Sequence, residues 1–117
     1  MDYRLQGTIE KWIKENDLEN DIDRISFGGP CKGSDPAMKY ISICIEKHGV
    51  KNVYLTQHDD CAGYGGHAAF GSLEEERKKI SDDMMAVKKD VLAKYPDVNV
   101  STLLIQEDGD EWKIIEI

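Results

Sequence analysis

Apolar residues recur at helical spacing in two segments of the N-terminal half of the chain. Residues 5–18 predict a helix with one apolar face, because three side chains fall at positions i, i+3 and i+4: Ile9, Trp12 and Ile13. A second helix is predicted after Asp35, which can cap its N-terminus, with Pro36 at the first helical position. Gly49 suits the position just beyond its end. The apolar stripe of this helix consists of Tyr40, Ile41, Cys44, Ile45 and His48.

The third predicted helix carries the clearest end signals. Ser72 and Glu75 have the spacing of a capping box, in which side chains satisfy the free backbone N–H groups of the first turn. Pro96 lies just beyond the predicted end and cannot continue the helix. Apolar residues keep helical spacing along one face, at Ile80, Met84, Val87, Val91 and Tyr95.

Four β-prone runs complete the pattern, at residues 23–27, 52–57, 98–106 and 112–117. The first ends at the turn Gly28-Gly29-Pro30, and the last two are joined by the hairpin signal Asp108-Gly109. Helices that alternate with strands predict an α/β fold, with a mostly parallel β-sheet flanked by helices and a C-terminal hairpin strand. With 117 residues and no linker or internal repeat, residues 1–117 are expected to form one domain.

The composition is that of a soluble globular protein, with 40% apolar and 32% charged residues. Asp and Glu outnumber Lys and Arg by 23 to 15, which gives a net charge of −8. This balance disfavours nucleic acid and anionic membranes as partners, because both need a basic surface. No apolar run reaches the length of a membrane span, and no signal peptide is visible.

The cysteine count points to a reducing compartment. The three cysteines are Cys31, Cys44 and Cys61. An odd number without a secretion signal argues against a disulfide framework and favours a cytoplasmic location. At least one thiol is therefore free to be a metal ligand, a nucleophile or part of the core.

The segment 57–66, which follows the second β-prone run, carries the strongest candidate chemistry. His58 is predicted at the C-terminal end of a buried strand, the edge at which open α/β sheets bind ligands. Cys61 follows three positions later, so both side chains can reach one metal ion from a single turn. Imidazole and thiolate are the ligands that zinc prefers. A zinc ion needs at least one further protein ligand, and none lies nearby in the sequence.

Two motifs in the expected order resemble the β-class carbonic anhydrases. His58-Asp59-Asp60-Cys61-Ala62-Gly63 is similar to the second zinc motif of that family, a His-x-x-Cys-Gly turn after a strand, with Ala62 in place of the usual glycine. Asp2 and Arg4 match the last two named positions of the first zinc motif, Cys-x-Asp-x-Arg, with Met1 at the intervening position. The resemblance extends to about Gln106 and is closest to a compact prokaryotic branch.

The same comparison implies that the domain is N-terminally truncated. The first strand of the family is absent, and its zinc-ligand Cys would directly precede Met1. In the fold that the resemblance implies, this strand is central in the sheet. Its absence is expected to leave neighbouring strands unpaired, with a slot in the core, and we expect the natural reading frame to extend upstream through it.

The resemblance implies a zinc enzyme that hydrates CO2 reversibly to bicarbonate. Zn²⁺ would be bound by His58, Cys61 and the missing Cys. The catalytic pair would be Asp2 and Arg4, in which the Arg holds a carboxylate that accepts a hydrogen bond from the attacking hydroxide or closes the site as a fourth ligand. The family also implies a homodimer or a higher homo-oligomer.

Other interpretations of these residues stay open. The domain could be an inactive or zinc-poor relative with a binding or structural role, or an unrelated α/β metal-dependent hydrolase. Taken alone, Asp2 and Arg4 fit a solvated terminus and Cys61 a buried apolar residue. Structural roles fit Cys44 in the core, His48 at a helix end, and Asp59 and Asp60 as turn formers or acceptors behind the ligands. Functional roles stay open for Cys31 as a substitute ligand and for His67 as a proton shuttle, against the usual case of an exposed loop histidine with no specific role.

Overall fold

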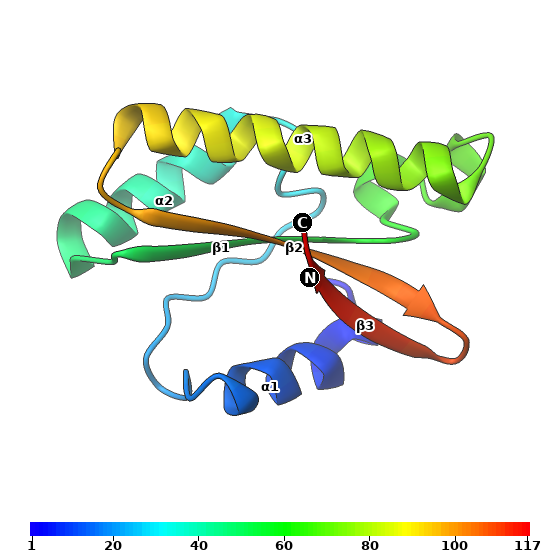
Figure 1. The fold of residues 1–117 in the computed structure, drawn as a ribbon, viewed down its shortest axis with the longest axis horizontal. Coiled ribbons are helices and arrows are strands. Elements are labelled where there is room, and N and C mark those ends of the chain that lie inside the picture. The colour runs from blue at the N-terminus through cyan, green and yellow to red at the C-terminus, as the bar shows by residue number, and fades with distance from the viewer.

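A three-stranded sheet lies between two helical layers in the computed structural model, which describes all of residues 1–117 (Figure 1). Helices α2 and α3 cover one face of the sheet, and α1 lies on the other. The elements are 3₁₀ helix η1 (Tyr3–Leu5), α1 (Gln6–Glu15), α2 (Ser34–His48), β1 (Asn52–His58), 3₁₀ helices η2 (Ala62–Tyr64) and η3 (His67–Ala69), α3 (Leu73–Lys94), β2 (Asn99–Asp108) and β3 (Glu111–Glu116).

The strand order is β1-β2-β3, with β1 and β2 parallel and β2 and β3 antiparallel. The predicted α/β architecture with a C-terminal hairpin is therefore confirmed, but the sheet is mixed rather than mostly parallel. Gly109 sits in the hairpin turn with a positive φ of 64°, a conformation that glycine adopts without strain. None of the helices combines the length and the apolar character needed to cross a bilayer.

Helix α3 forms as its sequence predicts. The Ser72 hydroxyl accepts a hydrogen bond from the Glu75 N–H at 3.1 Å, and the Glu75 carboxylate accepts one from the Gly71 N–H at 3.1 Å. The predicted apolar face packs on the sheet, and four of its residues are fully buried in the main core: Ile80, Met84, Val87 and Val91.

The start of α2 differs from the prediction. The helix begins at Ser34 with Gly33 as its N-cap, so Asp35 lies in the first turn and caps nothing. The Ser34 hydroxyl instead hydrogen bonds the Asp90 carboxylate, which ties this end of the helix to α3. The predicted end is confirmed, because Gly49 has a φ of 68° and its N–H donates to the Ile45 carbonyl.

The prediction of a strand at residues 23–27 is wrong. This segment runs in an extended conformation, but residues 22–28 make no backbone–backbone hydrogen bond. A strand exists only when a neighbour pairs with it, and here the nearest sheet edge is β1, which is paired with β2 on its other side alone. Both backbones are therefore left unpaired.

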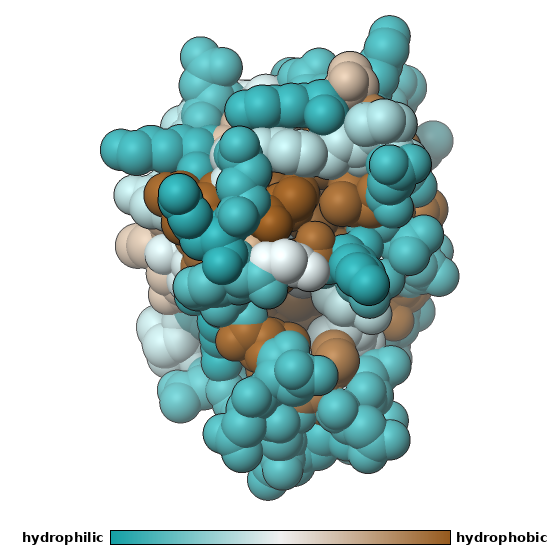
Figure 2. All heavy atoms as spheres, turned by 90° about the vertical axis from the view of Figure 1, so that its left-hand side faces the viewer, coloured by the Kyte–Doolittle hydropathy of each residue, from teal (hydrophilic) through white to brown (hydrophobic).

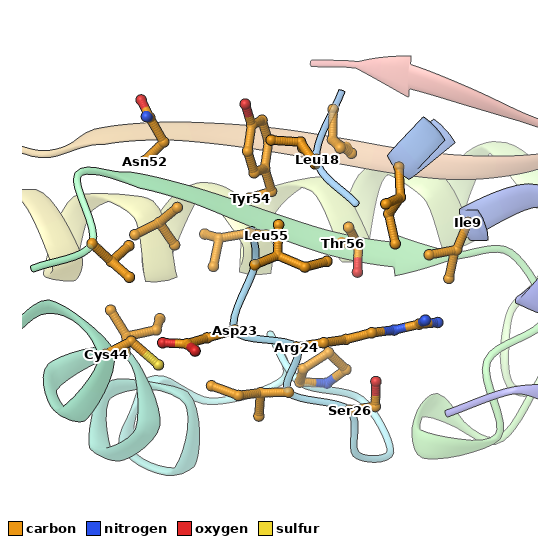
Figure 3. Close-up of a pocket in the computed structure, with 18 of the residues that line it drawn as sticks. Ile9, Leu18, Asp23, Arg24, Ser26, Cys44, Asn52, Tyr54, Leu55 and Thr56 are labelled. Carbon is orange, nitrogen blue, oxygen red and sulfur yellow. The ribbon is translucent and has the colours of Figure 1, made fainter. Parts of the chain in front are cut away.

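A groove of about 480 Å³, here called the β1 groove, separates the 21–27 segment from the free edge of β1. Figure 3 shows Asp23, Arg24 and Ser26 on one side of it and the β1 residues Leu55 and Thr56 on the other. Figure 2 looks at the end of the molecule where β1 begins and shows apolar surface recessed between hydrophilic rims. Most residues that line the groove are apolar, among them Ile9, Trp12, Ile22, Ile41, Val53 and Ile114.

Candidate active site

His58 and Cys61 lie at the carboxyl end of β1, where parallel pairing holds the backbone. His58 is paired with Ile105 of β2, and the Asp59 N–H donates to the Ile105 carbonyl at 3.0 Å. The chain then reverses through Asp60, which has a φ of 55°, and the Cys61 carbonyl accepts hydrogen bonds from the next turn. Both candidate ligands are buried, with 9% and 4% of their surface exposed.

One ring nitrogen of His58 is free to bind a metal. Its Nδ1 lies 2.6 Å from the Asp59 carbonyl oxygen, which can only accept, so Nδ1 carries the proton and Nε2 is left with its lone pair. Burial opposes charge on both His58 and Cys61. Their mutual hydrogen bond, backbone hydrogen bonds and the opposite charge of the partner together outweigh it, since the pKa of His58 is raised and that of Cys61 is lowered from its ordinary value. The pair therefore favours the thiolate, the form of cysteine that binds metals.

Asp2 and Arg4 reach the same place from the N-terminus. The Asp2 carboxylate caps η1 by accepting the Arg4 N–H at 2.9 Å, and the Arg4 guanidinium returns to it with contacts of 3.0 and 2.6 Å. This hydrogen bonding lowers the pKa of Asp2 to about 2, so the carboxylate is ionised near neutral pH. Its Oδ2 lies 3.9 Å from Nε2 of His58.

The sequence did not reveal two further partners of Arg4. The guanidinium donates to the Asp60 carboxylate at 2.9 Å and to the Asp60 carbonyl at 3.1 Å. It also lies over the Trp112 ring of β3, 5.5 Å from the ring centroid. Arg4 is thus held from three sides, and the loop after β1 is linked to the N-terminal segment.

The turn that carries Cys61 depends on one close backbone contact. A Cβ atom at Gly63 would lie 2.7 Å from the Gly29 nitrogen, so only glycine fits there. The contact brings the 28–30 turn against the candidate site. Cys31, considered as a substitute ligand, is buried in the apolar core, and burial raises the pKa of its thiol to about 12. Without a metal ion the thiol is therefore protonated near neutral pH.

No third ligand completes a set around His58 and Cys61. The structure contains one group of three metal-ligating side chains whose ligand atoms all lie within 4.8 Å, and it consists of Asp60, His67 and Glu107. In it, His67 lies between the carboxylates of Glu76 and Glu107, at 2.7 and 3.1 Å. Hydrogen bonding to these groups raises the pKa of His67 to about 8. The sequence pointed to His67 alone, since its two partners come from α3 and β2.

Of the remaining sequence candidates, His48 and Cys44 lie away from this edge, and Asp59 lies directly behind it. His48 is exposed and pairs with Asp23 at 2.6 Å, and Cys44 is only partly buried on α2. Asp59 is fully buried and accepts hydrogen bonds from Arg77 and from the Glu107 N–H, so it acts as a structural acceptor behind the turn.

Comparison with known protein families identifies the family of the chain. A family model described as "Putative carbonic anhydrase" matches the chain over residues 1–117. The chain belongs to this family. The resemblance seen in the sequence is thereby confirmed at the level of the family.

Two relatives of this chain have names that state no activity. An uncharacterized protein of Rickettsia bellii is 24% identical over 128 residues, which cover 99% of this chain and 78% of the relative. An uncharacterized protein of Rickettsia conorii is 25% identical over 129 residues, which cover 100% of this chain and 69% of the relative. No solved structure matches the chain.

Proposed function

We propose that this domain belongs to a zinc-dependent carbonic anhydrase that converts CO2 and water reversibly to bicarbonate. The observation that carries the proposal is the convergence of Asp2, held by Arg4, on the buried His58 and Cys61 at the end of β1. Membership of the family supports the reaction class, and the geometry supports the role proposed for each residue.

The donor set fits zinc in kind. An imidazole whose Nδ1 is held by the Asp59 carbonyl, which leaves Nε2 for an ion, and a cysteine with a lowered pKa are two of the ligands that zinc takes in tetrahedral sites. When bound, zinc supplies the Lewis acidity that lets a water molecule lose its proton near neutral pH. Backbone contacts keep the side chains of His58 and Cys61 in place, and these contacts need no metal ion.

The third ligand is proposed to come from a strand that fills the β1 groove. The unpaired edge of β1 and the unpaired 22–28 segment face this groove, and both would gain hydrogen bonds from a strand inserted between them. Its apolar lining suits a Val- and Ile-rich strand buried on both faces. Such a strand corresponds to the first strand that the resemblance implies.

The direction of this strand follows from the position of the groove, which adjoins the candidate metal site. A second hollow, lined by Met1, Asp2, His58 and Cys61, shares residues Ile9, Ile25 and Thr56 with the groove. A strand parallel to β1 would therefore end beside His58 and continue directly into Met1. Its last residue, proposed to be Cys, would lie at the candidate metal site.

Asp2 is proposed to act on the proton of the reacting water. Its carboxylate is ionised, with a pKa of about 2, and lies beside the metal-binding face of His58, so it can accept a hydrogen bond there. Arg4 would hold the carboxylate in this position, since it occupies both Asp2 oxygens and is itself fixed by Asp60. The dyad would thus orient the nucleophile for attack on CO2.

Replacing Asp2 should reveal this role. In zinc-loaded protein that includes the proposed strand, Asp2→Ala should lower kcat for CO2 hydration by about 100-fold or more, the scale of general-base contributions. Stopped-flow hydration assays with a pH indicator measure this directly. Asp110→Ala, at an exposed position in the hairpin turn, is the matched control and should leave the rate unchanged.

Two outcomes would support other functions. Hydrolysis of an ester without CO2 hydration would favour a metal-dependent hydrolase at the same site. Protein that includes the strand, binds zinc and yet hydrates no CO2 would favour an inactive relative with a binding or structural role.

We also propose that the protein is at least a homodimer. The outer edge of β3 is unpaired and belongs to a C-terminal segment, Trp112 to Ile117, that is rich in apolar residues. Exposed strand edges pair readily with another chain. Light scattering at micromolar concentration should give at least twice the chain mass of 13.2 kDa, and a monomeric mass would contradict the proposal.

A further inference from the structure

A second cluster of ligating side chains lies on the far side of Arg4 from Asp2. It consists of Asp60 from the loop after β1, His67 from η3 and Glu107 near the end of β2. Each offers one ligand atom, and the three atoms lie within 4.8 Å of one another. Neither His58 nor Cys61 takes part in it.

A buried carboxylate, that of Glu76, fixes the tautomer of the His67 ring. Its Nδ1 lies 2.7 and 3.1 Å from the two oxygens of Glu76, a side chain that is 1% exposed. The same carboxylate accepts the Asp60 N–H at 2.8 Å, which fixes its position. A carboxylate that accepts from one ring nitrogen and leaves the other for a metal is the usual arrangement of metal-binding histidines.

The opposite nitrogen of His67 then faces another acceptor. With the proton on Nδ1, the lone pair of Nε2 points at Oε2 of Glu107, only 3.1 Å away. Two acceptors at this distance repel each other unless a cation lies between them. In the absence of metal a second proton on the ring fills this role, since both ring nitrogens face carboxylate oxygens. A divalent cation would fill it by binding both atoms.

Asp60 supplies the third ligand atom, an oxygen, from a loop in which the backbone approaches closely. Its Oδ1 accepts the His67 N–H at 2.9 Å, and a Cβ atom at Gly66 would lie 2.9 Å from the same oxygen. Gly66 has a φ of 72°, so the turn that brings these groups together requires glycine.

The charges around the cluster also match a divalent cation. Asp60 is paired with Arg4, and the neighbouring Asp59 is paired with Arg77. This leaves the carboxylates of Glu76 and Glu107 without a fixed positive partner other than His67. When a metal ion takes the place of the proton on Nε2, His67 is neutral and the two carboxylates carry two negative charges, which one ion of charge +2 balances.

From this geometry we propose that Asp60, His67 and Glu107 form a second metal site, for a divalent transition-metal ion such as Zn²⁺. One imidazole and two carboxylates suit such ions, with water completing the shell. Because Asp60 also holds Arg4, an ion bound here contacts the same loop as the proposed active site while sharing no ligand with it.

Co²⁺ distinguishes the two sites, because only a site with Cys61 gives a thiolate-to-metal charge-transfer band in the near ultraviolet. We expect metal-free Cys61→Ser protein to bind one Co²⁺ without this band. In the same background, His67→Ala should abolish binding, and Glu107→Gln should weaken it at least as much as the about 10- to 100-fold typical of changes behind a ligand. Glu107 is partly exposed, so its replacement leaves the fold intact.

His48→Ala is the matched control. His48 also pairs with a carboxylate, Asp23, at 2.6 Å, but it belongs to no group of three ligand atoms that all lie within 4.8 Å of one another, so its replacement should leave Co²⁺ binding unchanged. The proposal is overturned if Cys61→Ser protein with a native circular dichroism spectrum binds no Co²⁺. It is equally overturned if Glu107→Gln and His67→Ala bind the ion as tightly as their parent. These outcomes do not depend on the catalytic proposal, which concerns the thiolate site.

Discussion

Extending the chain by a Val- and Ile-rich strand that ends in Cys directly before Met1 should raise both its stability and its zinc content. The strand would pair with the free edge of β1 and with residues 22–28, and would bury its side chains in the β1 groove. Two or three buried apolar side chains and the new hydrogen bonds should add about 3 kcal/mol or more to the free energy of unfolding. This corresponds to a rise in Tm of about 10 °C.

Zinc content should change at the same time. Residues 1–117 offer two ligands at the thiolate site, so we expect weak binding there, and the added Cys should bring occupancy to one zinc ion per site. Calorimetry and metal analysis measure the two effects. An extension of equal length with Lys at the inward-facing positions is the control. The proposal that the groove binds this strand is contradicted if the Val- and Ile-rich extension stays sensitive to protease and leaves Tm and zinc content unchanged.

Replacing Arg77, the positively charged partner of Asp59, should lower the stability of the fold strongly, although Arg77 itself is partly exposed. The Asp59 carboxylate is fully buried and takes contacts of 3.0 and 2.6 Å from the Arg77 guanidinium, which reaches it from α3. Arg77→Met would leave a buried charge with the Glu107 N–H as its remaining donor. The expected cost is about 3–5 kcal/mol, which urea unfolding followed by circular dichroism measures.

Two variants test whether the buried charge is the cause. Lys78→Met removes the neighbouring ion pair with Asp82, which is exposed, and should cost less than about 1 kcal/mol. Asp59→Asn combined with Arg77→Met removes the charge together with its partner and should recover part of the loss. A double variant as unstable as the sum of both single variants would show that the two residues stabilise the fold independently.

The sequence by itself determined the elements whose signals are local. The spacing of apolar residues and the cap at Ser72 gave α3, and the Asp108-Gly109 pair gave the hairpin of β2 and β3. It also determined that His58 ends a strand, although only the C-terminal part of that strand is buried. These features depend on interactions within a few residues of one another, so a pattern along the chain contains them.

The family motifs in the sequence predicted the chemistry of the candidate site but not its surroundings. Asp2, Arg4, His58 and Cys61 were identified before the fold was known, and the structure brings them to one edge of the sheet. The roles of Asp60 and Trp112 in holding Arg4 appear only in three dimensions. Their spacing from Arg4 in the sequence follows no local rule.

Only the tertiary structure decided where pairing fails and where distant charges meet. Residues 23–27 have the composition of a strand, but a strand is made by its neighbour, and the adjacent position in the sheet is a groove. His67, Glu76 and Glu107 lie on three separate elements, and folding places them within hydrogen-bond distance. Long-range contacts of this kind depend on how the elements pack, because no period or motif along the chain records which side chains will face one another.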